Sequence, residues 1–234
     1  PTRRRPVRGP ASTSARRRLA VVLVALALFA GATGAYLLVG DTLRALRYAT
    51  PTPAVIADPG AGSPVATGPI TPTRIHVPAI GVRTIVEPAP ATEELNPFTG
   101  EVVSTFPVPG GPHTTVWWEE GPMPGSDGLA VVLGHARTSG SAVFDDLPDL
   151  AVGAPIGVTG RSSDGTEVVA RYVVADVVTG ISKSDPDALR AVLAASPSGA
   201  ALALITCSGE IDGELSSRED NTVVFATLEA MYAP

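Results

Sequence analysis

Alternating apolar and polar residues, many of them β-branched, dominate the chain after residue 72. This period-two pattern is typical of strands that bury one face. It predicts eight strands, at residues 73–77, 83–87, 114–118, 129–134, 155–158, 167–178, 201–207 and 222–228. Glycine and proline clusters separate these runs, for example at 110–112 and 124–125, and they predict tight connections.

One helical pattern interrupts the predicted strands. An Asp-Pro-Asp cap at 185–187 precedes residues 188–195, in which Leu189, Val192 and Leu193 have helical spacing. A second, shorter helical turn is predicted at 142–147. Many short strands with one real helix predict an all-β domain, folded as a closed or nearly closed barrel of about eight strands.

The N-terminal part of the chain has a different pattern. Residues 19–40 carry no charge over 22 positions. As a helix they would extend about 33 Å, enough to cross a bilayer. The arginine-rich residues 1–18 precede this run and predict a basic cytoplasmic tail, with the rest of the chain outside the cytoplasm.

A cleaved signal peptide is the alternative interpretation of this segment. Residues 19–29 would be its apolar region and residues 30–32 its small-residue cleavage site. Apolar character resumes at 36–39, which favours an uncleaved anchor. Both interpretations place the remainder of the chain outside the cytoplasm.

A proline-rich stretch follows the anchor. Residues 49–72 contain six prolines among Ala, Thr, Gly and Ser, a composition that cannot bury a core. We therefore expect an extracytoplasmic linker over 41–72 and a folded domain over 73–234, which is long enough to form a real core.

Charge and cysteine content exclude several classes of protein. From residue 73 onward the chain has 8 basic and 21 acidic residues, a net charge of −13, which repels nucleic acid. The chain has one cysteine, so it cannot form an internal disulfide, a cysteine zinc finger or an iron–sulfur cluster. Scattered acidic residues without EF-hand spacing predict no metal site, and no cofactor is predicted.

The lone cysteine, Cys207, ends an apolar strand and precedes Ser208-Gly209. It could simply be a small buried hydrophobic residue. A thiol at a strand end outside the cytoplasm is, however, exposed to oxidation, and Val or Ala would pack as well there. Its position therefore favours a nucleophile.

A thiol nucleophile needs a proton partner, and the chain has three histidines. His76 lies within a predicted strand, and His113 lies in a Gly/Pro loop. His135 follows the apolar run 129–134, so it emerges at a strand end as Cys207 does. It could be structural, but two strand ends can meet at one rim of a barrel, and Gly134 would allow another segment to approach closely.

Arg218 is the candidate for stabilising the oxyanion that forms when a thiol attacks a carbonyl. It is the only arginine after Cys207, in the segment that leads to the last predicted strand. A solvated loop charge is the alternative interpretation.

With these residues in place, the chain resembles the sortases, membrane-anchored cysteine transpeptidases of bacterial surfaces, and within them the actinobacterial class F. The resemblance covers residue 73 to the C-terminus and depends on motifs in a fixed order. They are RIHVPAIGV at 74–82, WEEGPMPGSDG at 118–128, VLGH at 132–135, LITC at 204–207 and DNTVVFA at 220–226.

The resemblance implies a sortase-like barrel and a two-step transfer. Cys207 would cleave a Leu-Pro-x-Thr-Gly-type sorting signal between Thr and Gly through a thioester, with His135 as acid and base. Arg218 would stabilise the oxyanion and Thr206 would support the site. The partners would be secreted proteins with a C-terminal sorting signal and an amine acceptor from a cell-wall precursor or a pilin, at the cell membrane.

Three other classes of protein are alternatives to a sortase. An L,D-transpeptidase would have its cysteine within Ser-x-Gly-Cys and an arginine two residues after it, but here Glu210 and Ile211 follow Ser208-Gly209. A papain-like protease places its cysteine before its histidine, the reverse of this chain. A non-catalytic, surface-anchored β-domain that binds peptide stays open.

Overall fold

The computed structural model describes residues 63–137, 139–215 and 217–233. The predicted tail at 1–18, the anchor at 19–40 and most of the linker lie outside these residues. Within the described part of the chain, no helix combines the length and apolar character needed to span a membrane.

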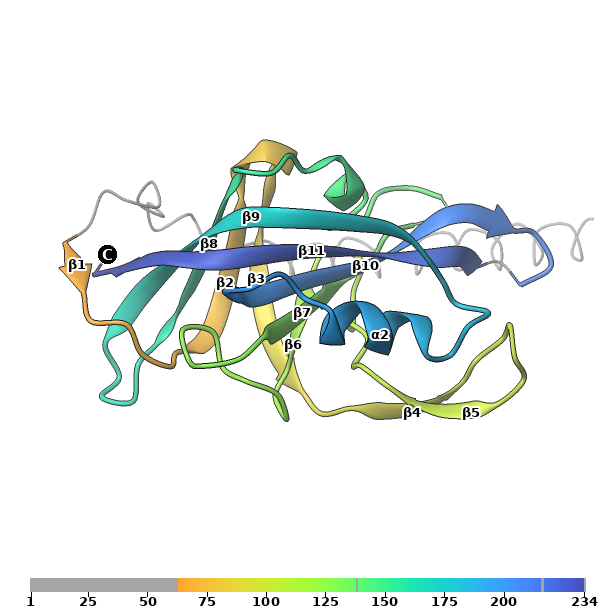
Figure 1. Ribbon diagram of the computed structural model, residues 1–234, viewed down its shortest axis with the longest axis horizontal. Helices are drawn as coiled ribbons and strands as arrows, with labels where there is room; N and C mark the ends of the chain where they lie inside the picture. Colours follow the sequence, from red (N-terminus) through yellow and green to blue (C-terminus); the bar gives the residue numbers. More distant parts are fainter. Residues whose placement is uncertain (1–62, 138, 216, 234) are drawn as a thin grey trace, which may run out of the picture. The chain divides into compact units, whose positions relative to one another are not determined.

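Eight strands of the described residues close into a barrel (Figure 1). Their order is β11-β10-β7-β6-β3-β2-β8-β9, and β9 pairs back onto β11. Only β3–β6 and β7–β10 are parallel pairs among these. The strands are β2 (Thr71–Val77), β3 (Val82–Ala89), β6 (Thr115–Trp118), β7 (Ala130–Gly134), β8 (Pro155–Arg161), β9 (Glu167–Ser182), β10 (Ala200–Asp212) and β11 (Ser217–Tyr232). The prediction of an all-β closed barrel is confirmed.

The remaining elements lie outside the barrel wall. The predicted helix is α2 (Ala188–Ala194). Where a helical turn was expected, at 142–147, residues 143–146 form turns that lead into the 3-10 helix η2 (Leu147–Asp149), and η1 (Pro78–Ile80) follows β2. A two-stranded hairpin, β4 (Thr92–Leu95) with β5 (Val102–Thr105), was not predicted. Figure 1 shows α2 beside β10 on the side of the barrel that also carries this hairpin.

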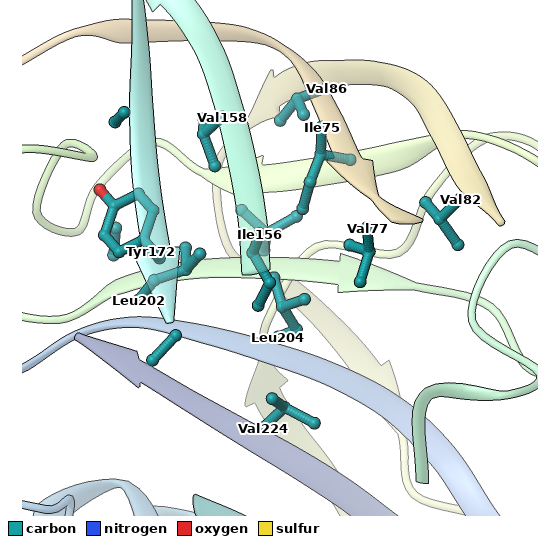
Figure 2. Packing of buried hydrophobic residues seen from close by; sticks show 14 of the residues in the cluster. Ile75, Val77, Val82, Val86, Ile156, Val158, Tyr172, Leu202, Leu204 and Val224 are labelled. Carbon is teal, nitrogen blue, oxygen red and sulfur yellow. The ribbon is translucent and has the colours of Figure 1, made fainter. Parts of the chain in front are cut away.

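Alternate residues of the central strands point into two separate apolar clusters. On β10, Leu202 and Leu204 face the barrel interior, where they pack with Val224 and Tyr172 (Figure 2). Ala203 and Ile205 face the outside of the barrel and pack in a second cluster beneath α2. Because both faces are covered there, β10 is apolar at every position from 200 to 205, and truncating such a leucine to alanine typically costs about 2–5 kcal/mol.

Two contacts fix the segment that enters the barrel. The amide of Ile70 donates to Pro124 O at 2.9 Å, and the amide of Gly125 donates to the Tyr172 hydroxyl at 2.9 Å. Burial raises the pKa of the Tyr172 phenol above its usual value.

Strand β1 (Pro64–Val65), paired with the end of β11, and the start of β2 lie within the segment predicted as linker. The boundary at residue 73 stays a prediction.

Candidate active site

The ends of β7 and β10 bring the two predicted reactive side chains to one edge of the barrel. The strands run in parallel, with Ile205 level with Leu133. Two residues further on, Cys207 lies on the same outward face of β10, and His135 follows β7. Since neighbouring strands lie about 4.8 Å apart, this register makes the half-buried Cys207 and His135 neighbours.

Thr206 joins these two strand ends. Its buried hydroxyl donates to Gly134 O at 2.9 Å, one residue before each reactive side chain. Gly134 is required for a different reason: an added Cβ would lie 2.3 Å from Cδ2 of Phe144. The close approach expected at this glycine is therefore made by the Phe144 ring. The amide of Phe144 also donates to His135 O at 3.0 Å.

The imidazole of His135 is oriented by a loop carbonyl. Its Nε2 lies 2.9 Å from Pro109 O. A carbonyl only accepts hydrogen bonds, so Nε2 carries the proton in this contact. That leaves Nδ1 as the nitrogen of the neutral ring that can exchange a proton with a reacting group.

Arg218 bridges the segments that follow the two strand ends. Its Nη1 donates to Gly209 O and its Nη2 to Arg137 O, both at 2.8 Å. Its Nε is buried and has no hydrogen-bond partner among the described residues. The side chain lines a pocket of about 380 Å³ together with Cys207, so the structure brings the predicted arginine to the cysteine.

A larger groove of about 890 Å³ also reaches Cys207. The outward face of the barrel forms its floor, α2 forms one wall and the β4–β5 hairpin contributes another. Apolar side chains dominate the lining, including Leu133, Ile205, Phe106, Trp118, Leu189 and Leu193. The rings of Phe106 and Trp118 pack edge to face, with their centroids 5.2 Å apart. A cleft of this size and character suits an extended peptide with apolar side chains.

Comparison with known proteins agrees with this geometry. A family model described as the sortase domain matches residues 75–229. The chain belongs to the sortase family. Sortase members of several bacteria have similar structures at low identity, and no curated protein sequence matches the chain.

Three solved sortases illustrate this similarity. Sortase A from Corynebacterium diphtheriae is 20% identical over 70% of this chain and 62% of its own, with a TM-score of 0.45. Sortase C1 from Streptococcus agalactiae is 20% identical over 67% and 66% (TM-score 0.43), and a Clostridium perfringens Sortase D5 transpeptidase is 21% identical over 70% and 82% (TM-score 0.43). The chain thus spans less than two thirds of the first two structures. Class F stays a prediction from the motifs.

The sortase domain contains site residues that the sequence did not reveal. Asn221 lies directly across from Cys207 in the β10–β11 pair and lines the large groove. A bulge between Ser208 and Ile211 shifts the register of the pair by one residue, so that Arg218 pairs with Ile211 rather than with Glu210. The Pro109 carbonyl at His135 also had no signal in the sequence. An unbroken register counted from the hairpin turn would have placed Thr222, not Asn221, across from Cys207.

The other two histidines lie elsewhere. His76 pairs with Arg83 and Gly157 within the barrel wall, and the backbone of His113 accepts a hydrogen bond from the Thr84 hydroxyl. Across the described residues, no group of three or more His, Cys, Asp or Glu side chains is placed to hold a metal ion.

Proposed function

We propose that this sortase-family protein is a cysteine transpeptidase that acts on a Leu-Pro-x-Thr-Gly-type sorting signal. The observation that supports the proposal is the parallel register of β7 and β10, in which Cys207 and His135 follow paired residues, together with the lining of the large groove by Cys207. A thiol with an adjacent oriented imidazole is the arrangement that nucleophilic catalysis requires.

In the first step the Cys207 sulfur attacks the threonine carbonyl carbon of the Thr–Gly peptide bond in the signal. His135 takes the thiol proton and gives it to the departing amine, leaving a thioester on Cys207. The contact with Pro109 O supports Nδ1 as the nitrogen that moves this proton. Arg218 is the donor proposed for the oxyanion, because it lines the smaller pocket with Cys207 and its guanidinium has further N–H groups beyond the two that donate to Gly209 O and Arg137 O.

The large groove is the site proposed for the signal peptide. Its apolar walls at Leu189, Leu193 and Trp118 match the Leu and Pro side chains of the signal. Asn221, across from Cys207, offers an amide that can hydrogen-bond the peptide backbone next to the cleaved bond. Thr206 supports the site through its bond to Gly134 O.

The proposal includes the placement of the enzyme at the cell membrane. Residues 19–40 are uncharged and follow an arginine-rich segment, which supports a single-pass anchor with a cytoplasmic N-terminus. The partners are secreted proteins with a C-terminal sorting signal and an amine acceptor from a cell-wall precursor or a pilin. Anchoring enzyme and substrate in one membrane raises their effective concentration.

Incubating the full chain with a Leu-Pro-x-Thr-Gly peptide and an amine tests the proposal. Mass spectrometry should detect the peptide joined to the amine, and Cys207→Ala should abolish this product. The alternative, a non-catalytic peptide-binding β-domain, predicts that peptide binds equally well to both proteins and that neither forms a product. Absence of any transfer across several motif variants would refute the proposed activity.

A further inference from the structure

The segment of β11 that carries Arg218 is only partly supported by β10. The pairing of the two strands has a bulge between Ser208 and Ile211, and it resumes at the pair of Ile211 with Arg218. A bulge disrupts the hydrogen-bond ladder locally and leaves the strand free to bend. The position of the Arg218 backbone therefore depends on the neighbour along the other edge of β11.

That neighbour is β9, which runs along the other edge of β11 (Figure 1) and ends at Ser182. Lys183 continues the ladder by one residue, because its amide donates to Glu219 O at 2.9 Å. The next amide does not reach Arg218: the amide of Ser184 donates instead to Ser182 Oγ at 3.3 Å, where the chain turns toward α2. The backbone of β9 thus stops one step short of the carbonyl of Arg218.

The side chain of Lys183 takes the place of the missing amide. Its Nζ donates to Arg218 O at 2.8 Å in a half-buried position. Lys183 is the only lysine of the chain, and its ammonium forms no salt bridge with any described residue. Its own carbonyl accepts from Asn96 Nδ2 at 3.2 Å, which fixes Lys183 from the side of the β4–β5 hairpin. A hydrogen bond from a charged donor is stronger than one between neutral groups, so this contact can hold the strand.

We infer that Lys183 is a positioning residue for Arg218, an inference that rests on the proposed transpeptidase function. Lys183 holds the main chain of Arg218, while two other carbonyls hold the guanidinium, so the arginine is fixed at both ends beside Cys207. A donor that stabilises an oxyanion must be in place before the charge develops, and a displacement of about 1 Å can reduce the rate about a hundredfold.

A second role for Lys183 is distinguishable from this one. Lys183 also lines the large groove, where its side chain could contact the donor peptide. Loss of a contact made equally in the bound peptide and in the transition state weakens binding and leaves the maximum rate unchanged. Loss of the position of Arg218 lowers the maximum rate and leaves peptide binding unchanged. The maximum rate and the half-saturating peptide concentration therefore separate the two roles.

Acid-quenched acylation of the full chain by a Leu-Pro-x-Thr-Gly peptide at varied concentration tests the inference. Lys183→Met removes the ammonium at similar length, and it should lower the maximum rate about tenfold without changing the half-saturating concentration. Lys183→Arg keeps a charged donor and should restore most of the rate. The matched control is Arg161→Met, since Arg161 Nη1 also donates to a backbone carbonyl, Gly165 O at 3.4 Å, but lines neither pocket. It should leave both quantities unchanged.

Alkylation of Cys207 by iodoacetamide provides a readout that does not need Arg218 or the peptide. Lys183→Met should react at the wild-type rate, because the thiol and His135 stay in place; a rate that falls as much as acylation does would indicate general damage and overturn the inference. An unchanged maximum rate of acylation, or a higher half-saturating concentration as the only effect, would also overturn it. Lys183→Ala repeats the test if Lys183→Met fails to fold. A wild-type chain that is never acylated would instead overturn the proposed function, and the inference with it.

Discussion

Replacing Thr206 by valine tests whether the hydrogen bond between the ends of β7 and β10 positions the reactive groups. Valine has nearly the same shape as threonine but cannot donate to Gly134 O, a bond of 2.9 Å made by a side chain that is 2% exposed. Losing a buried hydrogen bond of this kind costs about 1–3 kcal/mol of stability, because the carbonyl stays buried without its donor.

The catalytic effect should exceed the effect of this lost stability. The bond joins the residues directly before Cys207 and His135, so its loss lets the two side chains separate. A displacement of about 1 Å at a reacting pair can reduce the rate about a hundredfold. We therefore expect kcat/KM of Thr206→Val to fall at least about tenfold, mainly in kcat, at a temperature where the variant is fully folded.

Urea unfolding and transfer kinetics measure the two effects separately. Thr206→Ser keeps the hydroxyl and should restore most of kcat. Thr84→Val is the matched control, since that buried threonine also donates to a backbone carbonyl, His113 O, but lines neither pocket. It should lose stability with little change in kcat. Equal kcat values for Thr206→Val and Thr84→Val would refute the positioning role.

Three further predictions follow from the fold and the groove. Tyr172→Phe should cost about 1 kcal/mol near pH 8, through the lost bond to the Gly125 amide. Burial raises the pKa of this phenol, so the folded protein favours the protonated form. The stabilising effect of the protonated phenol is complete below pH about 10 and is lost as the pH rises further. The wild type should therefore lose more stability than the variant in urea unfolding above pH 10, and parallel curves would contradict this. Asp164 accepts from the Ser162 hydroxyl and the Thr166 amide, which lowers its pKa to about 2. The stabilising effect of this carboxylate is present above pH about 4 and is lost as the pH falls toward 2. The Tm of Asp164→Asn should therefore fall less than the Tm of the wild type over this pH range, and an equal fall would contradict this. Leu193→Asp should raise the KM for the donor peptide about tenfold, and an unchanged KM would contradict the large groove as the site of the signal peptide.

The barrel and the central pair of site residues could be predicted from the sequence because their signals are local. The apolar run 201–207 and the apolar run 129–134 each stop at a reactive residue, Cys207 and His135. Two buried strands of this kind must lie next to each other or close by in a small barrel. The eight predicted strands correspond to β2, β3 and β6–β11, with ends that differ by a few residues.

What the sequence could not reveal depends on tertiary contacts. The β4–β5 hairpin exposes its larger apolar residues, Leu95 at 63% and Val102 at 68%, so it has no buried face that would produce alternation. It is connected to the loop after β9 by Asn96, whose Nδ2 donates to Lys183 O at 3.2 Å. The partner of His135 is a backbone carbonyl, which any residue could supply. Asn221 faces Cys207 only because a bulge follows Ser208.

Mass spectrometry of the trapped acyl-enzyme tests the central claim most directly. The full chain is mixed with a Leu-Pro-x-Thr-Gly peptide without acceptor, quenched in acid within seconds and digested for peptide mapping. The account predicts a hydroxylamine-sensitive mass increase equal to the Leu-Pro-x-Thr acyl group, located on Cys207 and absent from Cys207→Ala. An unmodified Cys207 during measurable turnover, or an acyl group on a different residue, would contradict it.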